Sequence, residues 1–289
     1  MHKFLRAVGF SDIRKKDLEI ILNDIVDRPD VMKATRDSEG CEFAELASEY
    51  APGMGIKVCG TYEEDDQFHV EYYFPYLTGT SQTTQEPIEI QKHADRESYA
   101  GVCDEVNLGV TLIFYVQNIA DYLSEKRVQE FVQIPGAVMA GLSCEGSIIL
   151  PVLKREEKKQ TRENASRKHN ELVAEAREGN QEAMESLTLE EMDTYALISK
   201  RIMKEDVLSI VATYFMPYGI ESDQYAILGE IVDLTLEENK WTSEQIYRMK
   251  LKCNELLFDV CINKKDLVGE PEIGRRFKGS VWMQGNICL

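Results

Sequence analysis

The chain has 289 residues, a length that suits one large domain or two of ordinary size. Its 51 acidic and 33 basic residues give a formal net charge of −18, which repels phosphate backbones and argues against non-specific binding to nucleic acids or anionic membranes. No run approaches the roughly 20 apolar residues that cross a bilayer, and the N-terminal region is too charged for a secretory signal.

Cysteine and histidine usage limits the chemistry further. Seven cysteines are scattered along the chain without a CxxC pair. An odd number without framework spacing predicts free thiols and a cytoplasmic location. The four histidines are widely separated, so we expect no metal site and no cofactor.

The first half of the chain reads as helices mixed with strands. An apolar stripe predicts a helix over residues 17–26. Residues 108–116 are almost wholly apolar and predict a central strand covered on both faces. A second helix is predicted over 118–132, with Phe131 among its buried residues. Further strands are expected at four places: 55–62 and 67–74, which form a hairpin, 137–142 and 147–152.

A change of composition separates this half from the C-terminal third. Residues 154–187 lack proline and aromatic residues and are rich in Glu, Lys, Arg and Ala, which predicts an exposed helical connector. Strands are then expected at five places: 207–215, 225–236, 247–251, 256–262 and 276–287. Five short strands in so few residues favour a small closed barrel, either OB-like or SH3-like.

The fold class predicted from these elements is α+β. Residues 1–153 are expected to form an α+β domain with a mixed, mainly antiparallel sheet and helices. Residues 154–205 are expected to form the charged helical connector, and residues 206–289 a small β-barrel domain.

The stretch GEPEIGRRFKGSVWMQG, residues 269–285, is the most distinctive in the chain. Alternation along a strand places Phe277, Val281 and Met283 in the predicted barrel interior. The opposite row is expected on the outer face: Arg276, Lys278, Trp282 and Gln284. Arg and Trp on one face can stack a base, a sugar or a partner's side chain. The alternative is that Trp282 packs under the connector and the cations pair with the acidic excess, while the glycines serve turns and tight corners.

Few residues are suited to catalysis. Neither a GxSxG nor an HExxH motif is present. His93 is the only histidine with carboxylates close in sequence, among them Asp95, and is the candidate general base. Cys103 and Cys144 precede acidic residues, a setting that raises the pKa of a thiol and disfavours a nucleophile.

Three runs resemble a bacterial family of unknown function: MHKFLRAVGFSDI (1–13), YFMPYGIESDQYAILGEI (214–231) and FDVCINKKDLVGEPEIGRRFKGSVWMQG (258–285). Members of that family come chiefly from anaerobic Gram-positive bacteria and have a similar length. The resemblance covers the whole chain and implies a cytoplasmic bacterial protein. It implies no activity, cofactor or site residues, because the family has none assigned.

Two hypotheses about function follow. The first is a non-catalytic interaction or regulatory protein that binds another protein on the barrel face formed by Arg276, Lys278, Trp282 and Gln284. The alternative is an enzyme or small-molecule sensor with a pocket in the N-terminal domain near His93 and Asp95. We expect neither a membrane nor a nucleic-acid partner, and the sequence does not predict the oligomeric state.

Overall fold

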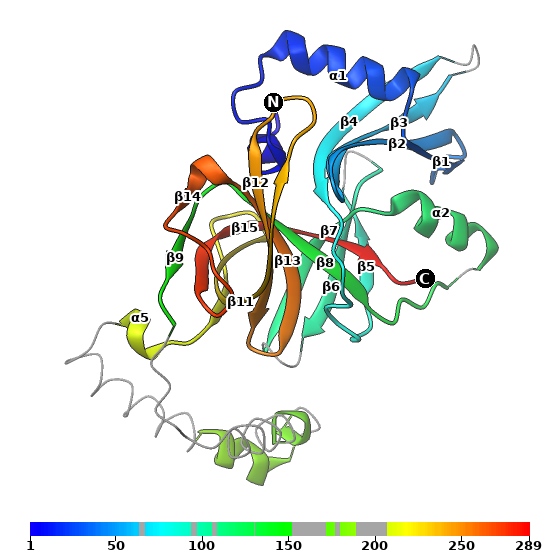
Figure 1. Cartoon of the computed structure of the whole chain (residues 1–289). Helices are drawn as coiled ribbons and strands as arrows, with labels where there is room; N and C mark the ends of the chain where they lie inside the picture. The colour runs from blue at the N-terminus through cyan, green and yellow to red at the C-terminus, as the bar shows by residue number, and fades with distance from the viewer. Residues whose placement is uncertain are drawn as a thin grey trace.

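The computed structural model describes residues 1–63, 67–93, 97–105, 109–129, 131–151, 172–176, 180–188 and 207–289. These residues form mostly β-strands with few helices, and the strands belong to more than one sheet (Figure 1). The predicted connector lies outside the described residues except for two short pieces that contain helix. Within the described ranges, no helix is both long and apolar enough to span a bilayer.

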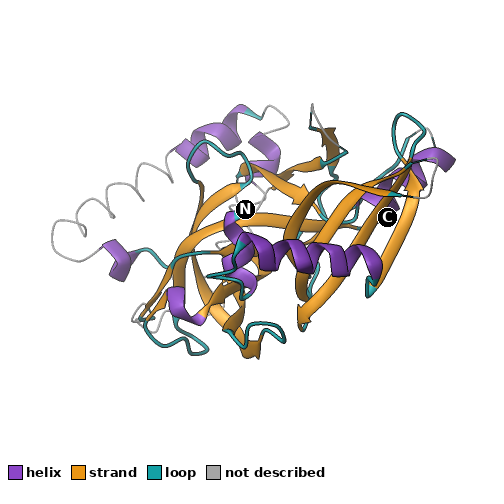
Figure 2. Cartoon of the chain, turned by 90° about the horizontal axis from the view of Figure 1, so that it is seen from above, coloured by secondary structure: helices purple, strands orange, loops and turns teal. Residues whose placement is uncertain are grey.

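Four antiparallel strands in sequence order form the first sheet, sheet A: β1 (Val31–Arg36), β2 (Glu42–Ala51), β3 (Met54–Tyr62) and β4 (Phe68–Leu77). The predicted hairpin is confirmed, since Tyr62 of β3 lies opposite Phe68 of β4. The predicted N-terminal helix is also confirmed as α1 (Lys15–Asp27), which contacts β2 and β3 and lies across the strands in Figure 2. Its buried residues, Leu18, Ile21 and Ile25, are spaced three and four apart and so share one helix face.

Eleven strands form the second sheet, sheet B, along the path β10-β11-β12-β13-β8-β15-β7-β6-β5 with β9 and β14 off this path. Its members are β5 (Glu89–Lys92), β6 (Tyr99–Glu105), β7 (Val110–Val116), β8 (Ala137–Ser143), β9 (Gly146–Ile149), β10 (Tyr214–Pro217), β11 (Gln224–Glu238), β12 (Gln245–Cys253), β13 (Leu256–Asn263), β14 (Leu267–Val268) and β15 (Arg276–Ile287).

Sheet B joins the two ends of the chain. Strand β13 pairs in parallel with β8, and β15 pairs with β8, β9 and β7. Strand β15 also pairs with β11, so the pairings run from β11 through β12, β13, β8 and β15 and return to β11. Because β7, β8 and β9 belong to the first 153 residues, the predicted boundary at residue 153 does not separate the strands into two sheets.

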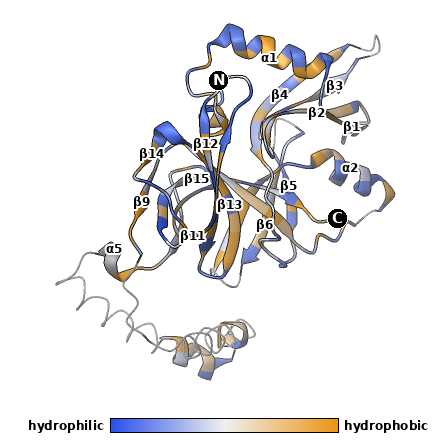
Figure 3. Cartoon of the chain, viewed as in Figure 1, coloured by the Kyte–Doolittle hydropathy of each residue, from blue (hydrophilic) through white to orange (hydrophobic). Residues whose placement is uncertain are grey.

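The hydrophobic core extends through both sheets. Buried apolar side chains from the N-terminal 3₁₀-helix η1 (Lys3–Val8), from sheet A and from sheet B form one cluster. In Figure 3, α1 shows hydrophobic and hydrophilic residues in alternation along its length, as expected for a helix with one buried face. A short 3₁₀-helix, η2 (Lys264–Asp266), follows β13.

Two predicted elements differ from the structure. Residues predicted as a strand over 207–215 form the short helix α5 (Val207–Ile210) before β10 begins. The helix predicted over 118–132 is α2 (Ile119–Val128), which ends because Gln129 adopts an extended backbone. Phe131 therefore leaves the helix and is 76 % exposed, so its predicted burial is wrong.

The glycines of the 269–285 stretch have two structural roles. Gly269 and Gly274 have φ values of 91° and 87°, a left-handed conformation that favours glycine, as the predicted turns require. A Cβ on Gly285 would lie 2.8 Å from the ring of Phe114. A Cβ on Gly279 would lie 2.6 Å from the ring of Phe277. Glycine at these strand positions allows aromatic rings to pack directly on the backbone.

Candidate functional site

The row of residues predicted on an outer face of β15 is largely buried. Arg276 is 4 %, Trp282 6 % and Gln284 0 % exposed, and only Lys278 lies on the surface. The expectation of an exposed binding face is wrong for these three side chains, because β15 is paired along both edges and other parts of the protein cover it at their positions. Each of the three makes a specific set of contacts inside the protein.

Arg276 holds together the two places where the chain leaves and re-enters sheet B. Its guanidinium donates to the carbonyl oxygens of Leu150, at 2.6 and 2.9 Å, and of Leu208, at 2.7 Å. It also donates to the carbonyl oxygen of Val211 at 2.7 Å. Burial lowers the pKa of Arg276. A planar guanidinium with several donors suits this site, because it can bind several carbonyl groups at once.

Trp282 lies in an aromatic cluster rather than against a partner. Its ring centroid lies 4.7 Å from that of His2 and 5.3 Å from those of Phe4 and Tyr115. The indole Nε1 donates to the carboxylate of Asp223 at 2.6 Å. Burial raises the pKa of Asp223, while the indole bond and His93 act in the opposite direction.

Gln284 connects sheet B to the end of sheet A. Its side-chain amide donates to the carbonyl oxygen of Pro75 at 2.8 Å, and its Oε1 accepts from Gln117 at 2.6 Å. Gln117 donates in turn to the carbonyl oxygen of Leu77 at 3.0 Å and accepts from Asn286 at 3.0 Å. A buried amide network is stable only when its members find partners, and these contacts provide them.

His93 does not occupy the buried pocket position expected of a general base. Its side chain is exposed on the surface after β5. Asp95, the carboxylate predicted to accompany it, lies outside the described residues. The fold instead brings His93 near Asp223, where it offsets only a small part of the rise in pKa that burial causes in that carboxyl group.

All seven cysteines are free thiols, and burial disfavours the thiolate at Cys103, Cys144 and Cys253. Burial is the main cause that raises the pKa of Cys103 to about 12 and that of Cys144 to about 11, with neighbouring acidic groups adding to the shift. Burial also raises the pKa of Cys253 to about 12. The direction predicted for Cys103 and Cys144 is therefore confirmed, and neither is activated as a nucleophile.

Buried carboxylates that the sequence analysis did not single out are also held by the fold. Glu45 accepts from the backbone N–H of Ile119 at 2.9 Å, at the start of α2, and lies 3.5 Å from the ammonium of Lys57. Burial raises the pKa of Glu45. Glu97 accepts from Lys92, Ser38 and Tyr99. These partners show structural roles, and no sequence motif marks either residue.

Two adjoining hollows follow α2 and the C-terminal residues, and we call them together the α2 groove. The first, of about 260 Å³, is lined by Glu125, Gln129, Phe131, Val132, Gln133 and Leu289. The second, of about 370 Å³, shares Glu125 and Leu289 and adds Asn118, Asp121, Ser124 and Ile287.

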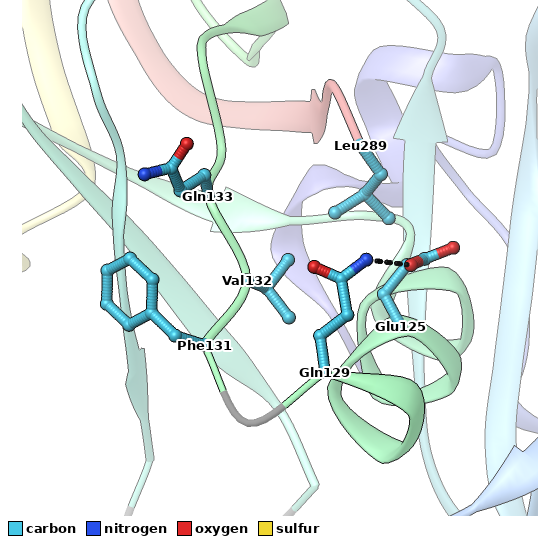
Figure 4. Close-up of a pocket in the computed structure, with 6 residues that line it drawn as sticks. All are labelled: Glu125, Gln129, Phe131, Val132, Gln133 and Leu289. Carbon is cyan, nitrogen blue, oxygen red and sulfur yellow. Dashed lines mark hydrogen bonds between the residues drawn. The ribbon is translucent and has the colours of Figure 1, made fainter.

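The α2 groove combines apolar surface with acidic groups. Figure 4 shows Val132 and Leu289 facing Gln129 and Glu125, with Phe131 on the other side of the 131–133 segment, at the rim. Next to it, Val128 at the end of α2 is 82 % exposed. Large apolar side chains exposed beside a hollow are typical of an interaction site.

No metal centre is formed by the described residues, since no group of three or more His, Cys, Asp or Glu side chains in the ranges given above is arranged to hold an ion. The geometry thus defines a mostly β protein in which Arg276, Trp282 and Gln284 are bound by other groups of the protein, and in which two hollows lie beside α2.

The family model described as "Domain of unknown function, E. rectale Gene description (DUF3881)" matches residues 5–285. The chain belongs to this family, as the resemblance in its terminal runs indicated. No curated protein and no solved structure matches the chain.

Replacement of Arg276 by methionine should destabilise the protein strongly. The variant leaves the carbonyl oxygens of Leu150, Leu208 and Val211 without their donor, and we expect a loss of about 2–4 kcal/mol in the free energy of unfolding. This loss is measured by urea denaturation, with circular dichroism as the signal. The matched control is Arg275→Met, whose surface pair with Glu272 should contribute less than about 1 kcal/mol. Equal losses for the two variants would contradict the proposed role of Arg276.

The segment between residues 153 and 205 should be replaceable without loss of the two sheets. The carbonyl oxygens of Leu150 and Leu208 both accept from the same nitrogen of Arg276, so the described residues that flank this segment lie side by side. A flexible Gly/Ser linker of about six residues is long enough to join them. We expect the shortened chain to unfold cooperatively with the same near-ultraviolet circular dichroism spectrum. An aggregated or unfolded product would show that the sheets need this segment.

The stability of the protein should fall in a particular pH window because of His2. Burial, with the charge of Lys3, lowers the pKa of His2 to about 4 from its ordinary value of 6.5, so the unfolded chain binds this proton more tightly. The contribution of neutral His2 to the free energy of unfolding is therefore fully present above pH 6.5, and it is lost as the pH falls towards 4. Between pH 6.5 and pH 4 the free energy of unfolding of the wild type should fall by about 2 kcal/mol more than that of His2→Gln.

Urea denaturation at several pH values measures this difference. His69→Gln is the matched control, because His69 is exposed on β4 and its replacement should leave the pH profile of the wild type unchanged. If His2→Gln and His69→Gln gave the same profile, His2 would not be the group responsible.

Proposed function

We propose that this protein is a non-catalytic interaction protein that binds a segment of another protein in the α2 groove. The observation that carries the proposal is the exposure of Phe131, which lines the first hollow, and of Val128, which directly precedes the lining residue Gln129. Water contact with such side chains costs free energy, which a partner that covers them would recover at about 25 cal/mol per Å² of apolar surface. The proposed partner is a protein, as expected from the sequence, but the proposed binding surface is the α2 groove instead of β15.

The base of the groove is fixed by contacts that do not depend on a partner. The side-chain amide of Asn118 donates to the carbonyl oxygen of Ile287 at 3.1 Å, and its side-chain oxygen accepts from the backbone N–H of Ile287 at 2.9 Å. The carboxylate of Glu45 holds the first turn of α2. A preformed surface loses little conformational entropy when it binds.

We also infer that the circuit β11–β12–β13–β8–β15 is a small barrel and that it serves as a rigid support. The chain of pairings returns to its starting strand, which leaves fewer open edges in this part of sheet B. In this interpretation one barrel strand comes from the N-terminal part of the chain, and Lys278 is the surface residue of β15 within it.

The alternative of an enzyme or small-molecule sensor near His93 has less support. His93 is exposed, and it is not among the residues that line the two hollows of the α2 groove. The buried thiols have raised pKa values, and the buried carboxylates Glu45 and Glu97 are bound by protein groups. These observations favour binding over catalysis.

Replacement of Phe131 by serine should reduce the affinity for the partner at least tenfold while leaving the fold intact, since the side chain is exposed. The partner is first captured from a lysate of the bacterium that encodes the protein, identified by mass spectrometry and purified. Its affinity for wild type and Phe131→Ser is then measured by isothermal titration calorimetry.

The matched control for this experiment is Ile220→Ser, which removes an apolar side chain that is 99 % exposed, on the turn between β10 and β11. This variant should bind like the wild type. A partner that binds Phe131→Ser as tightly as the wild type, or that is lost only with Ile220→Ser, would refute the proposed surface.

A further inference from the structure

We infer that the segment bound in the α2 groove is cationic: it places a Lys or Arg residue, flanked by apolar residues, against Glu125. This inference rests on the proposed function, because it gives the chemistry of the partner for the same groove. It is based on the charges that line the groove, on their existing partners and on the end of α2.

The charged side chains that line the groove are both acidic. Asp121 and Glu125 line it, and none of the other lining residues is Lys, Arg or His. The two carboxylates are four positions apart on α2, so they project from the same helix face with Cβ atoms about 5–6 Å apart. A partner with the opposite charge at this place is favoured over a neutral or acidic one.

The two carboxylates differ in what already binds them. Asp121 accepts from the ammonium of Lys33, on β1, at 2.7 and 2.9 Å. Glu125 accepts a bond of 3.4 Å from the amide of Gln129 and has no ion pair within the part of the chain that the structure describes. Glu125 is therefore the carboxylate that can receive a cation without displacing another.

The end of α2 adds to this negative potential. The last-turn carbonyl groups of a helix carry a partial negative charge, and α2 ends at Val128, next to Glu125 and Gln129. The basic residues of the same turn, Lys126 and Arg127, do not line the groove, and the ammonium of Lys126 lies 5.7 Å from the ring centroid of Tyr122. A cation beside Glu125 would interact favourably with both the carboxylate and the helix end.

Charge argues against a second copy of this chain as the occupant. A two-fold dimer through this surface would set the same acidic groove against itself, and each copy carries a net charge of −18. Like charges placed opposite each other in an interface lower its stability. A partner segment with Lys or Arg has the complementary charge.

The experiment uses three short fluorescein-labelled peptides with identical leucine positions and with lysine, glutamine or glutamate at all other positions. Binding to the full-length protein is measured by fluorescence anisotropy at about 0.15 M salt, where long-range attraction to the acidic protein is screened. The wild type should bind the lysine peptide at least tenfold more tightly than the other two. Glu125→Lys should weaken that binding at least tenfold.

The matched control is Glu238→Lys, which changes the net charge by the same amount at an exposed position on β11. This variant should bind the lysine peptide like the wild type. Equal weakening by the two variants would show attraction to the overall charge and overturn the inference. Binding of the glutamine peptide as tightly as the lysine peptide would overturn it as well, and so would the absence of binding to any peptide.

Phe131→Ser separates this inference from the proposed function. If the glutamine and lysine peptides bind equally and Phe131→Ser releases both, the cationic preference fails and the groove remains the binding surface. If Phe131→Ser leaves the lysine peptide bound as tightly as in the wild type, the groove itself is wrong. Sedimentation equilibrium tests the remaining occupant: a wild-type dimer that dissociates in Phe131→Ser would assign the groove to a second copy and overturn the inference.

Discussion

Hydrogen bonding along both edges of β15 is the constraint on which the rest of the structure depends. This strand pairs with β11 and β9 over its first half and with β8 and β7 over its second half. Its neighbours come from both ends of the sequence, so sheet B can be completed only when these distant segments meet. A strand in this position has no free edge, and its second half is covered on both faces, which is why Trp282 and Gln284 are buried there.

The polar residues inside the protein fix the positions of segments that strand pairing alone leaves free. Arg276 binds the two ends of the chain segment beyond β9, Gln284 binds the end of sheet A, and Asp259 accepts from the backbone and hydroxyl of Thr80. A buried polar group is costly without partners, so each of these contacts allows few alternative arrangements. In the function that we propose, binding takes place at the periphery, at the end of α2, where the apolar side chains of Val128 and Phe131 are exposed.

Local patterns predicted the elements well where one periodicity dominated. The stripe in α1 was sufficient, because this helix has one buried face, and the run of β-forming residues was sufficient for β3 and β4. Strands β1, β2, β5 and β6 were not singled out from the sequence, and residues 207–210 were predicted as strand although they form α5. The candidate site was missed for a related reason. The spacing of apolar residues predicted that the helix over 118–132 includes Phe131, whereas the helix ends at Val128 and Gln129 has an extended backbone. Spacing alone does not show where a helix stops.

The sequence by itself determined the acidic charge, the family, the absence of recognised catalytic motifs and the position of most strands of sheet B. These properties depend on composition and on neighbours within a few residues. Only the tertiary structure decided that β8 joins the C-terminal strands, that Arg276 and Trp282 are buried and that Phe131 is exposed. Burial depends on which surfaces cover a residue, and here those surfaces come from segments more than fifty, and in part more than a hundred, positions away, beyond the reach of any local period.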